Sequence, residues 1–333
     1  MKILIITPRI PYPPYRGDKL KIFNISRILA KTNDVHIITF YRNNKDKDLI
    51  KPLQELGIRV SLIKLRLIES LINTFFAIFQ TVPFQVAWYS SKKMKKGVEG
   101  LLKTESFDVV YYHLIRSAQY LSDSGVNTSL NVIDFTDAVS LYLSRMSEKE
   151  KNIFKKLFIK SELRRIDNYE NISEKFDVLF ICSEIDRKFL KEKGIKQDIQ
   201  VLNNGIDTDY FYGEQNDYDS KRIIFTGNMP YYANTDAAIY FAKEIFPLIL
   251  KKDPEVEFYI VGQQPPHSIK QLASKNIFVT GYVKDIKAEY LKSAVNIAPM
   301  RFGAGTLNKV LESIALGVPV VATSISMLGL PQE

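Results

Sequence analysis

The chain of 333 residues has a single cysteine, Cys182, so it cannot form an internal disulfide. This excludes a small secreted fold held together by disulfides and favours a reducing compartment. Cys182 lies in the apolar run FDVLFICS, where a buried thiol is expected. The sequence also has only three histidines, no Cys/His cluster, no Ser-His-Asp order and no Walker loop. Nothing in it therefore indicates a zinc site, a serine-hydrolase triad or a P-loop.

Long apolar runs are also scarce. The apolar run in MKILIITPRIPYP is too short for a signal peptide and predicts a first buried strand. Residues 70–91 carry no charge over a length close to the ~20 residues of a membrane span. Polar residues and a proline interrupt this segment, namely Asn73, Gln80, Pro83 and Gln85. It is therefore interpreted either as a domain helix or as an apolar face resting on a membrane, rather than as a span.

Acidic charge is scarce in the first part of the chain. Residues 1–200 carry a net charge of +11 and residues 201–333 a net charge of −2, within a total of +9. The basic part is expected to face an anionic partner. Nucleic acid is not expected, because zinc-finger spacing, aromatic RNA-reading motifs and basic heptad helices are absent. Phospholipid headgroups or a phosphorylated substrate fit better, and the basic stretches 92–96 and 151–165 are either membrane contacts or solvated surface charge.

Apolar strand-like runs such as KILIIT, FDVVYYH, RIIFTG and PVVAT alternate with amphipathic helical stretches along the whole chain. This alternation predicts parallel sheets covered by helices on both faces. The polar, aperiodic segment 203–221 predicts a linker between residues 1–202 and residues 222–333. The expected fold is α/β, with two doubly wound Rossmann-like domains facing a cleft. The second domain is expected to be incomplete, because no closing helix is predicted after PVVAT.

The stretch RFGAGTLNKVLESIALGVPVVAT, residues 301–323, predicts a strand end, a glycine-containing loop and a helix start. The buried stripe of this helix is expected to be Val310, Leu311, Ile314 and Ala315. A glycine loop at a helix N-terminus favours a phosphate group, and Lys309 adds a positive charge. Glu312, on the same helix face, is placed to accept hydrogen bonds from ribose hydroxyls. Together they indicate a nucleoside diphosphate; alternatively, Glu312 only complements the helix dipole and Lys309 is solvated.

This stretch, together with FTGNMPYYANTDAAIYFAKEIFP, VTGYVKD, VLNNGIDTDYF and TPRIPYPPYRGDK, resembles glycosyltransferase family 4, a GT-B family, and in particular its bacterial polysaccharide-assembly branch. The resemblance implies a retaining, metal-independent hexosyl transfer without a cofactor. The nucleotide-sugar donor would bind mainly to the C-terminal domain. The glycan or lipid-linked acceptor would bind mainly to the N-terminal domain.

The resemblance also assigns residues to the donor site. Glu312 matches the second glutamate of the family's Glu-x7-Glu motif, whereas Ala304 stands where the first is usual. Gly227 and Asn228 stand where a Gly-Arg pair is common, which leaves Lys309, with Arg301 as a helper, to face the diphosphate. The expected backbone contacts come from the loop residues Gly303, Ala304, Gly305, Thr306 and Leu307.

Four further residues match family positions. Gly17 corresponds to the N-terminal glycine loop near the donor phosphates, with a plain turn glycine as the alternative. Tyr282 and Val283 correspond to the base-binding residues, with an exposed β-turn as the alternative. His113, at the end of FDVVYYH, corresponds to a histidine near the donor sugar and is assigned with Lys309 to catalysis.

The sequence therefore predicts a cytoplasmic glycosyltransferase of cell-surface polysaccharide biosynthesis, peripheral on the inner face of the plasma membrane. One alternative is a nucleotide-sugar epimerase of the same fold, which would consume donor without an acceptor. Another is a non-catalytic nucleotide-sugar-binding subunit, which would bind without turnover.

Metal independence gives a first test. The Asp-x-Asp strings lie in a charged loop and in the linker segment, which are poor contexts for a metal site. Sugar transfer is expected to continue in excess EDTA, measured as release of nucleoside diphosphate. Activity that disappeared with EDTA and returned with Mg²⁺ or Mn²⁺ would contradict this expectation.

Overall fold

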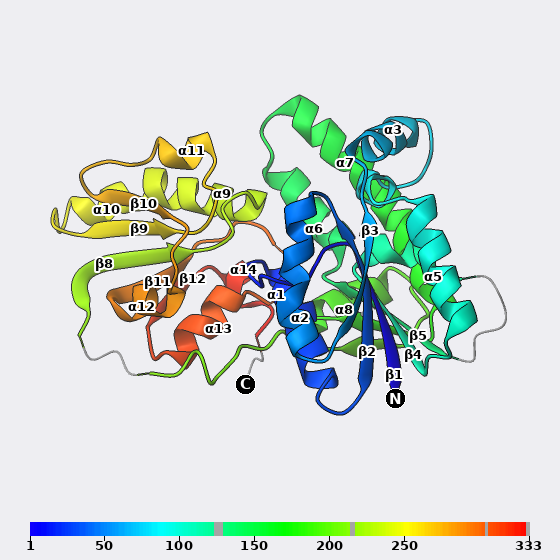
Figure 1. The fold of residues 1–333 in the computed structure, drawn as a ribbon. Helices are drawn as coiled ribbons and strands as arrows, with labels where there is room; N and C mark the ends of the chain where they lie inside the picture. The colour runs from blue at the N-terminus through cyan, green and yellow to red at the C-terminus, as the bar shows by residue number, and fades with distance from the viewer. Residues whose placement is uncertain (123–128, 214–216, 304–305, 331–333) are drawn as a thin grey trace. The chain divides into compact units, whose positions relative to one another are not determined.

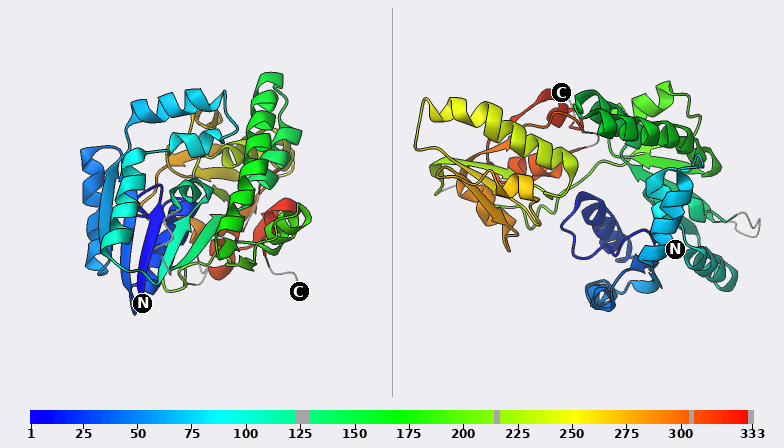
Figure 2. Two further views of the ribbon diagram at one scale, coloured as in Figure 1. Left: turned by 90° about the vertical axis from the view of Figure 1, so that its right-hand side faces the viewer. Right: turned by 90° about the horizontal axis from the view of Figure 1, so that it is seen from above.

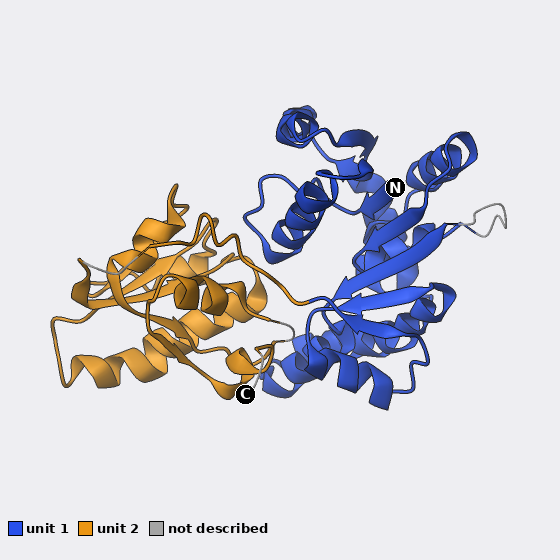
Figure 3. Ribbon diagram, turned by 90° about the horizontal axis from the view of Figure 1, so that it is seen from below, with its two compact units in different colours: residues 1–202 blue, residues 203–333 orange. Residues whose placement is uncertain are grey.

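The computed structural model describes residues 1–122, 129–213, 217–303 and 306–330. The chain divides into two compact units, residues 1–202 and 203–333 (Figure 3). Each unit is a parallel sheet covered by helices, as the sequence predicts (Figures 1 and 2). The first strand of the second unit, β8 (Asp219–Thr226), begins inside the segment 203–221 that was expected to be linker.

The first unit has a seven-stranded sheet with the order β3-β2-β1-β4-β5-β6-β7. Its strands are β1 (Lys2–Thr7), β2 (Asp34–Tyr41), β3 (Arg59–Lys64), β4 (Val109–His113), β5 (Leu130–Thr136), β6 (Val178–Ile181) and β7 (Ile199–Val201). Its α-helices are α1 (Gly17–Leu29), α2 (Lys51–Glu55), α3 (Leu67–Ala77), α4 (Phe84–Trp88), α5 (Lys92–Thr104), α6 (Val139–Lys149), α7 (Ile153–Tyr169) and α8 (Glu184–Glu192). Three 3-10 helices are η1 (Asn44–Ile50), η2 (Ile115–Tyr120) and η3 (Glu170–Lys175).

The second unit has a five-stranded sheet with the order β10-β9-β8-β11-β12. Besides β8, its strands are β9 (Glu257–Val261), β10 (Ile277–Gly281), β11 (Ser293–Ala298) and β12 (Val320–Ala322). Helix α9 (Tyr232–Tyr240) continues through a π-helical turn, η4 (Phe241–Ile245), into α10 (Phe246–Leu250). The other helices are α11 (His267–Lys270), α12 (Ile286–Leu291), α13 (Asn308–Ala315) and α14 (Ser324–Met327). The short α14 follows β12, where the sequence predicted no helix.

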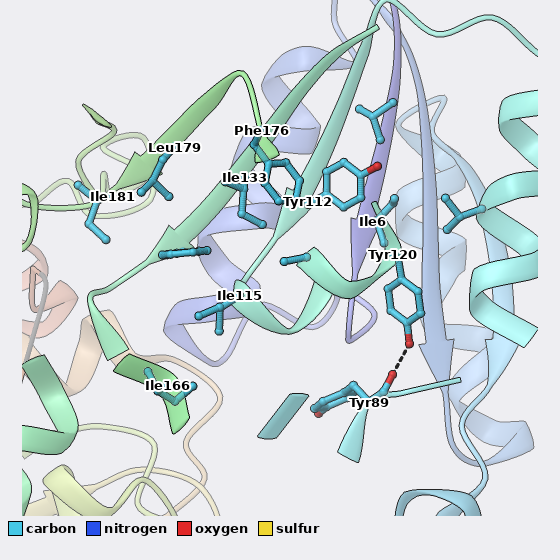
Figure 4. Close-up of a cluster of buried hydrophobic side chains, with 14 of the residues drawn as sticks. Ile6, Tyr89, Tyr112, Ile115, Tyr120, Ile133, Ile166, Phe176, Leu179 and Ile181 are labelled. Atoms are coloured by element: carbon cyan, nitrogen blue, oxygen red, sulfur yellow. Dashed lines mark hydrogen bonds between the residues drawn. The ribbon is translucent and has the colours of Figure 1, made fainter. Parts of the chain in front are cut away.

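Strand β1 shows why the sheets form. Its continuous apolar run is buried on both faces, because alternate side chains enter two different clusters. Leu4 and Ile6 pack into one cluster with Tyr112 and Ile133 (Figure 4). Ile5 packs into the other, on the opposite face. Apolar burial on both faces therefore fixes β1 as a central strand.

Each sheet has a point at which the strand order reverses. Strand β1 lies between β2 and β4, and β8 lies between β9 and β11. Ligands in open parallel sheets bind beyond the carboxyl ends of the strands at such points. A ligand site is therefore expected at the carboxyl ends of β1 and β4 in the first unit. In the second unit it is expected at the ends of β8 and β11.

The ends of β8 and β9 lie so close that they require glycine. An alanine Cβ at Gly262 would lie 1.8 Å from the carbonyl oxygen of Gly227, which is backbone and cannot move aside. At Gly227 a Cβ would lie 2.8 Å from the Asn234 side chain.

The contact predicts a large effect of Gly262→Ala. We expect this change to lower the free energy of unfolding by roughly 3 kcal/mol or more, because the two strand ends must separate. Urea unfolding followed by circular dichroism measures it. Gly205→Ala is the control in the same unit, because nothing lies within 4 Å of its Cβ position. Equal stability of the two variants would contradict the prediction.

Candidate functional site

Helix α13 presents its N-terminus at the carboxyl edge of the second sheet. It follows β11, which is a neighbour of β8, along the chain. Leu307 is the N-cap residue, with extended backbone, and its side chain makes no capping hydrogen bond. Backbone N–H groups of the first turn are thus not occupied by a cap side chain, which suits an anionic ligand.

Lys309, in the first turn of α13, is buried. Its Nζ donates a hydrogen bond to Oδ1 of Asn234 at 2.9 Å and lies 3.9 Å from the centre of the Phe225 ring. The ammonium thus contacts an amide and a ring face rather than a carboxylate. Burial lowers the pKa of Lys309 to about 7, and nearby Glu312 only partly offsets this.

The buried side of α13 differs from the predicted stripe. Val310 is buried as expected, but Lys309 and Ser313 share its side, whereas Ile314 is 56% exposed. Hydrogen bonds stabilise this orientation. Ser313 Oγ donates to the Val318 carbonyl at 3.0 Å, and Lys309 Nζ donates to Asn234 Oδ1. The alternative in which Lys309 is solvated is therefore wrong.

Glu312 lies one turn further along α13. Its Oε2 accepts a hydrogen bond of 2.9 Å from the hydroxyl of buried Tyr290, which also contacts Thr226 Oγ1 at 2.5 Å. Burial raises the pKa of the Glu312 carboxyl, while the Tyr290 hydroxyl and Lys309 act in the opposite direction. The carboxylate is thus oriented by a rigid hydroxyl, which suits a hydrogen-bond acceptor for a diol.

Asn234 connects the predicted residues of this site, although sequence reasoning missed it. While its Oδ1 accepts from Lys309, its Nδ2 donates to the backbone carbonyl of Asn228 at 3.0 Å. Asn228 follows Gly227 directly after β8, and its Oδ1 lies 3.4 Å from Gln263 Nε2. The available signal in the sequence was that Asn234, a polar residue, stands in the first turn of α9 directly before an apolar stretch.

Other predicted donor residues are arranged differently. Arg301, the expected helper, forms an ion pair with Asp236, with Nε 2.8 Å from Oδ2. Its charge is therefore already paired with a carboxylate of the same unit. Tyr282 is 55% exposed, whereas Val283 packs in the cluster that contains Tyr290.

The loop before α13 is only partly described. Thr306 is buried, and its Oγ1 donates to the Gly329 carbonyl at 2.8 Å. Gly303 and Leu307 lie on either side of Ala304 and Gly305, which are outside the described residues. The expected backbone contacts at Ala304 and Gly305 therefore stay predictions.

In the first unit, His113 is the last residue of β4, next to the end of β1. It lines a pocket together with Thr7, Pro8, Arg9, Asp18, Lys19, Ile22 and Leu114. Its Nε2 lies 3.0 Å from the carbonyl oxygen of Asp18, and its Nδ1 lies 3.9 Å from Oδ2 of Asp134. Because a carbonyl only accepts, Nε2 carries the proton. The buried Nδ1 has no hydrogen-bond partner among the described residues.

Asp134, on β5, is a fully buried carboxylate that sequence reasoning missed. It accepts hydrogen bonds from Lys21 Nζ at 3.1 Å, the Tyr111 hydroxyl at 2.6 Å and the Thr136 N–H at 2.7 Å. Burial alone would raise the pKa of Asp134, but Lys21, His113 and Tyr111 together hold it well below its usual range. An aspartate inside the apolar run NVIDFT was the available signal.

A cluster of arginines surrounds Asp18, the residue after Gly17 at the start of α1. Arg9 and Arg16 form ion pairs with its carboxylate. Burial acts to raise the pKa of Asp18, but Arg9, Arg16 and Arg116 outweigh it and lower the value to about 2. Arg116 is oriented by Gln85, at 3.0 Å from Nε, and its buried Nη1 has no hydrogen-bond partner among the described residues. The cluster suits an anionic group.

One group of three metal-type ligands occurs among the described residues: Asp137, Cys182 and Asp186, within 4.8 Å of one another. Cys182 is buried, as predicted, and its Sγ lies 3.1 Å from Oδ1 of Asp137. Asp186 accepts from the Ala138 N–H at 3.2 Å. Burial and Asp186 raise the pKa of Asp137 to about 7. These groups hydrogen-bond to protein partners, and none belongs to an Asp-x-Asp string.

Comparison with known proteins adds family evidence to this geometry. Residues 220–332 match the family model described as Glycosyl transferases group 1. Over 98% of the chain, the sequence is 23% identical to an uncharacterized 44.6 kDa protein in the cps region of Klebsiella pneumoniae, covering 84% of that protein.

Three solved structures show the same fold. HepE of Anabaena, in complex with UDP and glucose, has a TM-score of 0.64 at 14% identity, over 100% of this chain and 83% of HepE. Sucrose-phosphate synthase of Thermosynechococcus elongatus has a TM-score of 0.71 at 13% identity, over 98% and 82%. TarM has a TM-score of 0.69 at 12% identity, over 97% and 85%. The three likenesses show the GT-B fold for this chain. Membership of family 4 in particular stays a prediction.

The buried Lys309 predicts a pH effect on the stability of the second unit. The pKa of Lys309 is about 7 in the folded unit against an ordinary value of 10.5, so the unfolded chain binds more protons between these values. The destabilisation caused by burying a protonated Lys309 therefore decreases as the pH rises across this window, and the free energy of unfolding increases. Relative to Lys309→Met, the wild type should gain roughly 2 kcal/mol between pH 7.5 and 9.5.

Urea unfolding at the two pH values measures this difference. Lys275→Met is the control, because Lys275 is exposed and should leave the pH dependence unchanged. An identical pH dependence of the wild type and Lys309→Met would contradict a neutral, buried Lys309.

Proposed function

We propose that this chain is a retaining glycosyltransferase that moves a hexosyl group from a nucleoside-diphosphate donor to a glycan or lipid-linked acceptor during cell-surface polysaccharide assembly. One observation carries the proposal: Lys309 and Glu312 follow the uncapped N-terminus of α13 at the point where the strand order reverses. The group 1 domain match and the relative in a cps region support it.

The second unit offers separate groups for the two parts of a nucleoside diphosphate. Backbone N–H groups of α13 and the Lys309 ammonium suit the diphosphate, whereas the Glu312 carboxylate suits ribose hydroxyls. A uridine diphosphate donor is proposed, because structures of the same fold contain UDP or UDP-glucose. No metal is proposed, because the helix N-terminus and Lys309 supply the positive potential that stabilises the departing diphosphate.

The titration of Lys309 suits this role. At neutral pH its ammonium is only partly protonated, because burial lowers its pKa to about 7. A diphosphate placed near Nζ favours the charged form, so donor binding draws a proton to Lys309. The lysine then carries its full charge where negative charge increases as the sugar leaves, which is where catalysis benefits most.

The first unit is proposed to bind the acceptor. The arginines around Asp18, beyond the ends of β1 and β4, suit an acceptor bearing phosphate. Because Nε2 of His113 donates to the Asp18 carbonyl, we propose that His113 also holds the start of α1. Its catalytic role stays a prediction.

Binding experiments with single variants test the donor site. Lys309→Ala should weaken UDP binding by roughly 2–4 kcal/mol but leave uridine binding unchanged, because it removes only a charge that faces the diphosphate. Glu312→Ala should weaken both ligands by roughly 1.5–3 kcal/mol, because it removes hydrogen bonds to the ribose. Titration calorimetry measures all four affinities.

Lys275→Ala is the control, because it removes an exposed lysine from the same unit. If both site variants bind UDP like the wild type, the nucleotide site is not at α13. If they lose UDP as expected but the wild type releases no sugar from any UDP-hexose, the proposal reduces to nucleotide binding without transfer.

A further inference from the structure

Helix α3 has its large apolar side chains on the outside. Its buried residues are Ser70 and Ala77, whereas eight large side chains are exposed on α3 and in the turn that follows: Leu67, Ile68, Leu71, Ile72, Phe75, Phe76, Ile78 and Phe79. They recur every three to four residues and so form one stripe along the helix. Phe79 is 76% exposed. A helix of a water-soluble domain normally buries such a stripe, so this one is expected to have a partner.

The N-terminal half of α7 repeats the pattern. Ile153, Phe154, Leu157 and Phe158 are exposed, and Phe154 is 80% exposed. Their spacing places them on one side of the helix. In the C-terminal half, Ile166 is fully buried, so only the first two turns lack cover.

Helix α7 contacts both the end of α3 and the short helix α4 that follows it. The ring of Phe158 on α7 stacks on that of Phe84 on α4, with centres 5.4 Å apart. Arg165 on α7 donates to carbonyl groups at the end of α3, at 2.6 Å for Ala77 and 3.1 Å for Ile78, which satisfies carbonyls that the helix leaves unpaired. The buried Glu162 of α7 accepts from the N–H of Phe84 at 2.9 Å. Figures 1 and 2 show both helices at the same end of the first unit. We call this surface the α3–α7 face.

The charge on the α3–α7 face is mostly positive. Residues 151–165 contain six lysines and arginines and one acid, Glu162, which is used inside the fold. The only acid of α3 is Glu69, which pairs with Arg66 at 3.3 Å. Four lysines flank the apolar residues of α7, namely Lys151, Lys155, Lys156 and Lys160. An apolar face bordered by lysines complements a surface with hydrocarbon below and negative charge above.

We propose that the α3–α7 face docks the first unit onto an anionic lipid bilayer. Phenylalanine and aliphatic side chains enter the region between headgroups and acyl chains, while the lysines contact anionic headgroups. Docking is by surface contact, since no helix of the described residues has the length and apolar character to span a bilayer. The proposal goes beyond sugar transfer and uses no donor-site residue.

Vesicle sedimentation of the full chain tests the proposal. The wild type should bind vesicles made of equal parts phosphatidylglycerol and phosphatidylcholine, and bind pure phosphatidylcholine far less. Phe79→Ser combined with Phe154→Ser should lower the partition coefficient at least about tenfold, because each removes an exposed ring from the face. Tyr212→Ser combined with Leu248→Ser is the matched control, since both side chains are exposed in the second unit.

A second pair of variants tests the charge. Changing Lys151, Lys155, Lys156 and Lys160 to Gln should also lower binding about tenfold or more and reduce its dependence on salt. The control changes four exposed lysines of the second unit to Gln, namely Lys251, Lys252, Lys270 and Lys275, which alters the net charge equally.

Three outcomes would overturn the proposal. They are no vesicle binding by the wild type, equal losses in test and control variants, and a self-association that only the phenylalanine variant loses while vesicles stay unbound. The last would make the α3–α7 face an interface between copies of the chain. UDP affinity and circular dichroism, which should match the wild type in every variant, separate a failure here from misfolding and from a failure of the proposed donor site.

Discussion

Parallel strand pairing is the constraint on which the rest of this structure depends. In each unit every strand points the same way, so all carboxyl ends and the loops that follow them meet at one edge. Backbone groups that are not paired within the sheet, and polar side chains that the apolar strands cannot bury, lie at this edge. Ligands bind there, at the point where the strand order reverses. His113 and Asp134 reach that edge in the first unit, and Gly227 with the start of α13 reaches it in the second.

The two units treat a buried charge in opposite ways. In the first, Asp134 has a lysine and three hydroxyl or amide donors within hydrogen-bond distance, so the carboxylate stays ionised although it is buried. In the second, Lys309 has an amide oxygen and a ring face, which compensate much less for lost water, and its pKa falls to about 7. A fully compensated charge fixes a structure, whereas an undercompensated one can still gain from a ligand of opposite charge. This difference makes α13 the part of the fold best prepared for a diphosphate.

The α3–α7 face exposes large apolar side chains, which a folded domain normally buries. Apolar side chains normally leave water, and the interior of the first unit follows that rule, with Leu4, Ile5 and Ile6 fully buried. Helix α3 is held instead by polar contacts from behind, among them Arg165 at its end and Asn73 Nδ2, which donates to the Ser90 carbonyl at 3.0 Å. The apolar stripe is therefore not needed to keep α3 in place, and it remains available to a partner.

The sequence by itself determined the parallel α/β class, the two units and the beginning of helix α13, because these follow from local periodicity and from residues that only certain backbone shapes accept. Tertiary structure alone decided which side of α13 is buried. Periodicity placed Ile314 inside, but Asn234 and Phe225, distant in sequence, accommodate Lys309 there and leave Ile314 outside. The ion pair of Arg301 with Asp236 could not be predicted from the sequence for the same reason, because the two residues are distant in the chain. A periodic pattern specifies that a helix has two sides, whereas the side that is buried depends on contacts between segments far apart in the chain.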